Sequence, residues 1–225
     1  MRLLIVGLLV TLPGWGEDLL DKHFAAIGGA QRLNQVQTRV SEGTLEMPGG
    51  RAALTIWQKA PDRAVLELRL PGGTIRRGFD GASGWEDSTR SGPRAMAPTA
   101  QKAFAEEHAL SARTKEQILA KYPKRTPAGA NQLRLTPQDG SAPELWTFDP
   151  DTHLLTRINR EVDAGPQGIV PVTVILADYR KVGDLLLPHT VQTKTSVSTV
   201  TLRLDSVREG EPLSDALFAP KAQQP

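Results

Sequence analysis

An alternation of apolar and other residues with a period of two is the feature of this sequence that most restricts its fold. In Val65-Leu66-Glu67-Leu68-Arg69-Leu70, the side chains of Leu66, Leu68 and Leu70 share one face of an extended chain. Turn residues interrupt residues 36–88 about every ten positions, at Pro48-Gly49-Gly50, Pro61-Asp62, Pro71-Gly72-Gly73 and Asp80-Gly81. This spacing predicts a meander of about five short antiparallel strands.

Strand patterns resume in the second half of the chain. They occupy residues 132–136, 144–148, 153–161, 170–179, 185–195 and 198–207. Together with the meander they give about eleven strands, enough for a strongly curved sheet or an incomplete barrel. The fold class predicted is therefore mainly β, with an open antiparallel barrel that does not close on itself.

The N-terminus has the pattern of an export signal. Arg2 is followed by the apolar run of residues 3–12 and by the small residues of Gly14-Trp15-Gly16. The run is shorter than the roughly 20 residues that a membrane-spanning helix needs. We expect residues 1–16 to be a signal peptide cleaved near Gly16, and residues 17–225 to be a periplasmic chain that is not membrane-spanning. The alternative is a buried N-terminal strand or a membrane anchor.

Helical periodicity interrupts the strand pattern twice. Asp18 can cap a helix with Leu20, Phe24 and Ile27 on one face, which Gly28-Gly29 would end. A second helical stretch covers residues 98–122, where Pro98 suits a first turn. Residues 124–130, rich in Pro and Gly, indicate a loop. A single domain is the simplest interpretation, and a division into two domains at this loop is the alternative.

Composition excludes several classes of function. The chain contains no Cys, which excludes disulfide scaffolds and thiolate metal sites. Its 27 basic residues against 25 acidic ones give no strong positive field, so no nucleic acid partner is expected.

A search for catalytic motifs yields no complete set. Ser83 in Gly81-Ala82-Ser83-Gly84 lacks the spacing of a nucleophile elbow, and the chain has no glycine-rich phosphate loop. Its four histidines are isolated from one another in sequence, without the helical spacing that presents two metal ligands. We therefore expect no enzyme, no cofactor and no metal. The alternative, an envelope hydrolase, requires carboxylates or histidines that converge only in the folded chain.

Apolar side chains are the remaining candidates for a functional surface. A curved sheet too large to be filled by its own side chains can leave its concave face open to an apolar ligand, beneath a helical cover formed by residues 98–122. The alternative is that the same residues form an ordinary core. The residues predicted to line such a cavity are Trp57, Leu66, Leu68, Leu70, Trp85, Phe104, Leu110, Ile118 and Trp146.

Several segments in the same order resemble the outer-membrane lipoprotein-sorting proteins, whose fold is that of the periplasmic carrier LolA. They extend over nearly the whole chain after the leader. The segments are Ile27-Gly28-Gly29, Val40-Ser41-Glu42-Gly43-Thr44, Gly78-Phe79-Asp80-Gly81 with Trp85, residues 148–155, residues 178–189 and Leu217-Phe218-Ala219-Pro220.

The resemblance implies an open barrel of about eleven strands with a helical cover over its concave side. It also implies a periplasmic binding or carrier protein for lipid, for lipoprotein acyl chains or for another amphiphile. The alternative is a non-catalytic regulatory or interaction module that uses the same fold to bind a protein partner in the cell envelope.

Overall fold

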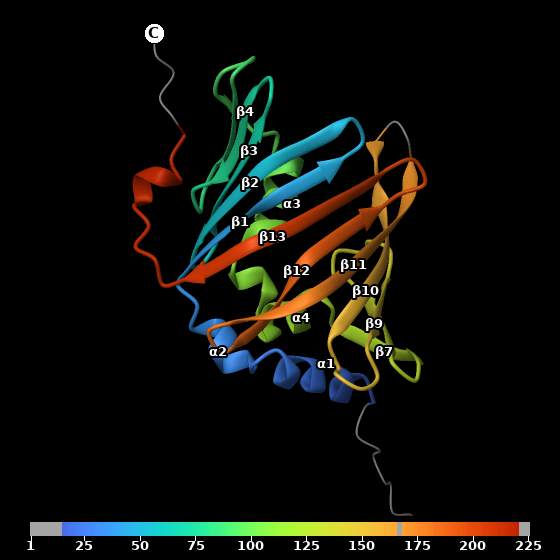
Figure 1. Cartoon of the computed structure of the whole chain (residues 1–225). Helices are drawn as coiled ribbons and strands as arrows, with labels where there is room; N and C mark the ends of the chain where they lie inside the picture. Colours follow the sequence, from blue (N-terminus) through green and yellow to red (C-terminus); the bar gives the residue numbers. More distant parts are fainter. Residues whose placement is uncertain (1–14, 166–167, 221–225) are drawn as a thin grey trace, which may run out of the picture.

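A computed structural model describes residues 15–165 and 168–220 of the chain (Figure 1). Within these residues, thirteen strands form one antiparallel sheet in the order β6-β5-β4-β3-β2-β1-β13-β12-β11-β10-β9-β8-β7. The edge strands β6 and β7 do not pair with each other, so the sheet is open. The fold is thus mainly β, as predicted.

The first half of the sheet is a meander of consecutive hairpins. Its strands are β1 (Thr38–Met47), β2 (Gly50–Lys59), β3 (Arg63–Leu70), β4 (Gly73–Phe79), β5 (Gly84–Ser88) and β6 (Arg94–Ala95). The second half is also a meander, formed by β7 (Lys124–Gly129), β8 (Gln132–Thr136), β9 (Glu144–Phe148), β10 (Leu155–Asp163), β11 (Ile169–Val182), β12 (Leu185–Lys194) and β13 (Thr199–Glu209). Pairing of β1 with β13 joins the two halves.

The helices gather on one side and at one end of the sheet (Figure 1). They are α1 (Trp15–Ala26), α2 (Ala30–Asn34), α3 (Pro98–His108) and α4 (Lys115–Lys121), with the short turns η1 (Ser111–Arg113) and η3 (Asp215–Leu217). No helix of the described residues is long and apolar enough to cross a membrane.

Helix α1 begins at Trp15, so Asp18 lies inside the helix and not at its cap. The predicted apolar stripe is confirmed, because Leu20, Phe24 and Ile27 are all buried. Most of the predicted leader, residues 1–14, lies outside the described residues.

The structure has two strands more than the sequence predicted. The additional ones are β6, only two residues long, and β7, which occupies the segment predicted to be a loop. Pro127 and Gly129 are unfavourable in a central strand. They are tolerated here because β7 is an edge strand that pairs only with β8.

Candidate ligand-binding face

The helices cover one face of the sheet, and strand register identifies the residues on that face. Ala64 of β3 pairs with Phe79 of β4, and both pack against Met96 and against Phe104 of α3. We call this face the concave face, since the sheet curves around α3 and α4 (Figure 1), and the opposite face the convex face. Directly paired residues share a face, so each ladder can be followed from this reference.

An aliphatic row crosses the concave face in the middle of the sheet. Leu45 of β1 pairs with Leu202 of β13, which pairs with Val191 of β12, which in turn pairs with Leu176 of β11. Leu176 packs against the buried cluster that contains Trp146, which confirms the face. All four members of the row are half-buried.

Neighbouring rows extend this strip into a larger surface. We define the apolar wall as ten half-buried aliphatic residues of the concave face, which lie on β1, β3 and β11 to β13. Its members are Leu45, Leu66, Leu68, Leu70, Val174, Leu176, Val191, Val200, Leu202 and Leu204. An ordinary core would bury such side chains fully. On β3, Leu66 packs against the cluster of Ala64 and Phe79 under α3, whereas Leu68 and Leu70 lie toward the other end of the strand.

Seven of the nine predicted residues lie on the concave face or on its cover. Leu66, Leu68 and Leu70 belong to the apolar wall. Trp146 also points to this face, but it is buried and meets Tyr122 edge-to-face, with 5.8 Å between ring centroids. Of the cover residues, Phe104 and Leu110 are buried and Ile118 is half-buried.

Trp57 and Trp85 were predicted to line the same cavity, and the structure places them on the opposite face. Trp57 pairs with Val65, Val65 with Gly78, and Gly78 with Trp85, so all four share the convex face. Leu66 and Leu68 point the other way because adjacent strand residues alternate between faces. The prediction grouped residues of different strands without knowing their register, which cannot be read from alternation within one strand.

The sequence prediction missed the contribution of β1 and of β11 to β13 to the wall. A signal was present in residues 199–205, Thr-Val-Thr-Leu-Arg-Leu-Asp, which alternate strictly. Alternation there identifies a strand with one apolar face, but not the fact that Leu202 lies opposite Leu45.

The convex face is occupied by the C-terminal segment. Phe218 is fully buried against Val65 and Trp85, and the Trp85 indole Nε1 donates a hydrogen bond of 2.7 Å to the Phe218 carbonyl. Gly78 lies directly beneath the indole, where a Cβ atom would come within 2.3 Å of the ring. Two segments of the family resemblance, distant in sequence, therefore meet to form one packed cluster.

The closed end of the concave face, under α1, is packed as a core. His23 of α1 is buried between Phe24 and Phe148, with ring centroids 5.7 and 5.6 Å away. Its Nδ1 lies 3.2 Å from the His153 carbonyl oxygen. Burial lowers the pKa of His23 to about 4, so the ring is neutral near pH 7.

A network of ion pairs lies near this closed end. Arg39 of β1 binds Glu209 with 2.8 Å between Nη2 and Oε1, and Arg32 binds the other carboxylate oxygen at 2.8 Å. Arg113 in η1 donates to the Glu107 carbonyl oxygen at 3.2 Å.

The helical cover is attached to the sheet by a small number of polar contacts. Gln58 of β2 donates from Nε2 to the His108 carbonyl oxygen at the end of α3. Ser111 donates its backbone N–H to the Pro61 carbonyl oxygen at 3.0 Å. Near the start of α3, the Gln101 side chain accepts from Gly84 N–H at 2.9 Å and donates to the Ala82 carbonyl oxygen at 3.1 Å.

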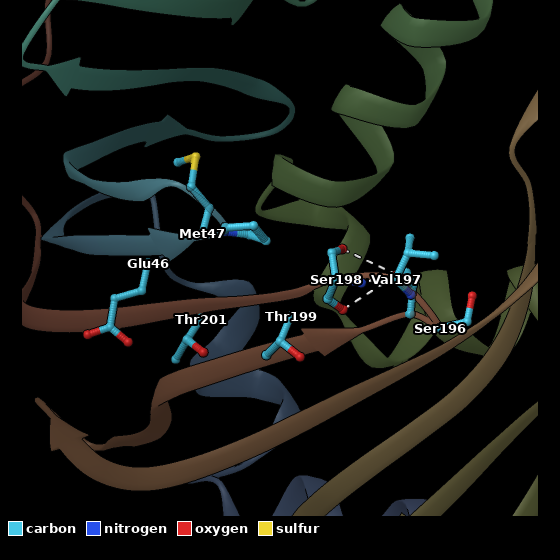
Figure 2. Close-up of a pocket in the computed structure, with 9 residues that line it drawn as sticks. Glu46, Met47, Ser196, Val197, Ser198, Thr199 and Thr201 are labelled. Atoms are coloured by element: carbon cyan, nitrogen blue, oxygen red, sulfur yellow. Dashed lines mark hydrogen bonds between the residues drawn. The ribbon is translucent and has the colours of Figure 1, made fainter.

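A hollow of about 510 Å³ lies at the hairpin end of the sheet, between the β1–β2 and β12–β13 turns (Figure 2). Hydroxyl-bearing side chains make up much of its lining. The lining residues are Glu46, Met47, Pro48, Thr195, Ser196, Val197, Ser198, Thr199 and Thr201. Glu46 pairs with Thr201 on the convex side of the ladder, so this polar hollow is distinct from the apolar wall.

No cluster of three or more His, Cys, Asp or Glu side chains that could hold a metal ion occurs among the described residues. His189 is buried on β12, with Nδ1 2.9 Å from the Leu187 carbonyl oxygen. Both His189 and His23 are thus buried side chains of the fold.

Similarity to known proteins is found by comparison with solved structures and not by comparison of sequences. No family model matches the sequence, and no curated protein matches it. A putative outer membrane lipoprotein-sorting protein domain from Vibrio parahaemolyticus superposes with a TM-score of 0.60 at 14% identity, over 90% of this chain and 95% of that one. A LolA superfamily protein from Nitrosomonas europaea gives 0.58 at 10% identity, over 91% and 97%.

The chain has a LolA-like fold. A DUF1329 family protein from Desulfovibrio piger shares this fold, with a TM-score of 0.63 at 13% identity over 94% of this chain and 100% of that one. The LolA-like fold was predicted from the ordered segments quoted above. The structure shows that two pairs of these segments meet in space. One pair is Trp85 with Phe218, and the other is Ile27 with Leu186, whose N–H donates to the Ile27 carbonyl oxygen at 2.9 Å.

Proposed function

We propose that the apolar wall binds acyl chains, and that the protein is a periplasmic binding or carrier protein for a lipid, a lipoprotein or another amphiphile. The observation that carries the proposal is the aliphatic row from Leu45 to Leu176, which four strands align on the concave face and the helices leave half-buried. A surface of this kind is stabilised when apolar groups cover it.

The chemistry of the wall favours a chain of methylene groups over a compact polar ligand. Its side chains carry no hydrogen-bonding groups, so they offer nothing to satisfy a buried polar atom. Each methylene group transferred from water to such a surface contributes about 0.8 kcal/mol. Affinity would therefore rise with acyl chain length, and the wall itself would distinguish poorly among headgroups.

The fold comparison supports the proposal, since one structure with this fold is described as a lipoprotein-sorting protein domain. The predicted signal peptide, residues 1–16, supports a periplasmic location, with residues 17–225 as the mature carrier in one domain. The cover formed by α3 and α4 would have to move for an acyl chain to enter fully. Such a movement would break polar contacts, among them Gln58 to His108, and would expose the buried side chains of Phe104 and Leu110.

Two adjacent residues of β11 provide a matched test. Leu176 belongs to the wall, whereas Ile175 pairs with Gln192 and Arg157 on the convex face, and both residues are half-buried. A fluorescent fatty acid would be titrated into the wild type, Leu176→Gln and Ile175→Gln. An amide without a partner in the binding surface costs about 1–3 kcal/mol, so Leu176→Gln should weaken binding about tenfold or more.

Ile175→Gln should bind the fatty acid as the wild type does, because it changes the other face of the same strand. Equal affinity of all three proteins would show that the probe binds elsewhere, and absence of binding to the wild type would contradict the proposal directly.

A further inference from the structure

Large apolar side chains that are exposed to solvent are confined to one end of the sheet. Among the described residues these are Val197, which is 88% exposed, Ile169 at 63%, and Val162 and Ile75 at 37% each. Val197 lies in the β12–β13 turn, Val162 and Ile169 flank the β10–β11 turn, and Ile75 follows the β3–β4 turn. Because alternate hairpins of a meander turn at the same end, all four lie at the end opposite α1 and α2 (Figure 1).

The β12–β13 hairpin joins this exposed end to the apolar wall. Its concave side carries Val191, Val200 and Leu202, which belong to the wall. Its turn carries Val197 between hydroxyl residues, as Figure 2 shows. The Thr195 hydroxyl accepts from the N–H groups of Val197 at 3.3 Å and Ser198 at 3.1 Å, which fixes the turn.

Near the turn of this hairpin, charge is scarce and has one sign. Between Val191 and Leu202 the single charged residue is Lys194, which is exposed and pairs with Thr199. Lys194 lies on the convex side of the ladder, so the concave side of the hairpin is uncharged from its turn to the wall. On the concave side of this hairpin, the side chains between Val197 and Leu202 are aliphatic or carry a hydroxyl group.

We propose that the β12–β13 hairpin docks the protein on the surface of an anionic lipid bilayer, with Val197 entering the apolar region. The hydroxyl groups around Val197 would face the lipid headgroups, and Lys194 would meet their negative charge. The inference rests on the proposed function, because it gives the apolar wall a route for loading from a membrane.

A lipid surface fits this hairpin better than a protein partner does. One exposed aliphatic side chain on a narrow turn, flanked by small uncharged residues, inserts into a fluid interface without requiring a complementary pocket. A stable protein interface needs a broader surface with buried anchor residues.

The absence of Cys from the chain permits a site-specific test on the full-length protein. Val197→Cys would be labelled with an environment-sensitive fluorophore and mixed with vesicles of phosphatidylglycerol and phosphatidylcholine in equal parts. The matched control is Lys181→Cys, an exposed position on β11 beside the turn at the helical end of the sheet. The label at residue 197 should show a several-fold rise in intensity and a blue shift, and the label at residue 181 should not change.

A second comparison tests the charge. Lys194→Gln should weaken binding of the protein to these vesicles several-fold, while Lys181→Gln should leave it unchanged. The proposal is overturned if the label at residue 197 does not respond to the vesicles, or if both labels respond equally. It is also overturned if binding to these vesicles is no stronger than binding to vesicles of phosphatidylcholine alone. A label at residue 197 that responds only to a captured protein also overturns it. None of these readings requires bound cargo, so docking can fail while acyl binding stands, and the reverse.

Discussion

Both faces of the sheet carry apolar side chains, and the two faces differ in how these side chains are covered. On the convex face, Phe218 fills the space between Val65 and Trp85, and its carbonyl oxygen satisfies the indole N–H. On the concave face, no comparable segment of the described residues lies over the row from Leu45 to Leu176, which stays half-buried. One face is completed by the chain's own residues. The other leaves apolar area that an external ligand can cover.

The difference also separates the part of the molecule that defines the fold from the part proposed to bind ligand. We call the packed group of Val65, Trp85 and Phe218 the convex cluster. It contains residues of the family resemblance, Trp85 and Phe218, and Gly78 lies beneath the Trp85 indole. The apolar wall is built from ordinary alternating leucines and valines. A sequence resemblance can therefore identify the architecture while giving no information on the cargo.

The largest effect is expected from truncation of the convex cluster. Trp85→Ala removes a buried side chain and its hydrogen bond to Phe218, and should lower the free energy of unfolding by about 3–5 kcal/mol. Trp57→Ala is the matched control. Because Trp57 is only half-buried on the same face, this substitution should lower the free energy of unfolding by less. Urea denaturation of the three proteins measures this difference. Equal losses would show that the convex cluster is not packed as described.

The free energy of unfolding should fall in acid because the closed end of the concave face, unlike the wall, is a packed core that contains His23. The pKa of His23 is lowered to about 4 by burial, from an ordinary value of 6.5. The unfolded chain thus takes up a proton at this residue at a higher pH than the folded chain does. Stability from this source is complete above about pH 6.5 and falls as the pH drops toward 4.

At pH 4.5 the loss through His23 should reach about 2–3 kcal/mol, at 1.36 kcal/mol per pKa unit. His108, whose pKa burial also lowers to about 4, adds to the loss in the wild type. His23→Gln should remove the His23 part, so that its stability changes less between pH 7.5 and pH 4.5 in urea denaturation. A variant that loses as much stability as the wild type over this range would show that His23 is not buried in a neutral form.

The smallest stability effects come from adding bulk to each face. Val65 is fully buried in the convex cluster, whereas Val191 is half-buried in the wall. Val65→Trp should therefore cost about 1–3 kcal/mol through overpacking, and Val191→Trp less than about 1 kcal/mol. Val191→Trp should nevertheless abolish fatty acid binding by filling the wall. A large loss of stability in Val191→Trp would show that the concave face is already filled.

Sequence periodicity predicted the fold well, because alternation and turn chemistry are local properties. The eleven strands expected are all present. The two other strands were not predicted. Strand β6 is too short to show an alternation of apolar and polar residues, and β7 is an edge strand that contains Pro127 and Gly129. The candidate site was less predictable. Leu66, Leu68 and Leu70 share the concave face because they alternate along one strand.

Trp57 and Trp85 were assigned to the wrong face because the face depends on pairing between strands. Hairpin geometry sets that pairing, and the loop from Asp80 to Ser83 is an example. There Asp80 Oδ1 accepts from Ala82 N–H at 2.9 Å and from Ser83 N–H at 2.7 Å. Gly78 opposite Trp85 was a usable signal, since a residue without a side chain leaves room for an indole on its own face.

The central claim is that the concave face is completed by acyl chains from outside the protein. Mass spectrometry of lipids extracted from the natively purified full-length chain tests it most directly, with Val191→Trp purified in parallel. We predict that the wild type carries acyl lipids in stoichiometric amounts and that Val191→Trp does not. Recovery of a protein partner without lipid from the wild type, or equal amounts of lipid from both proteins, would contradict the claim.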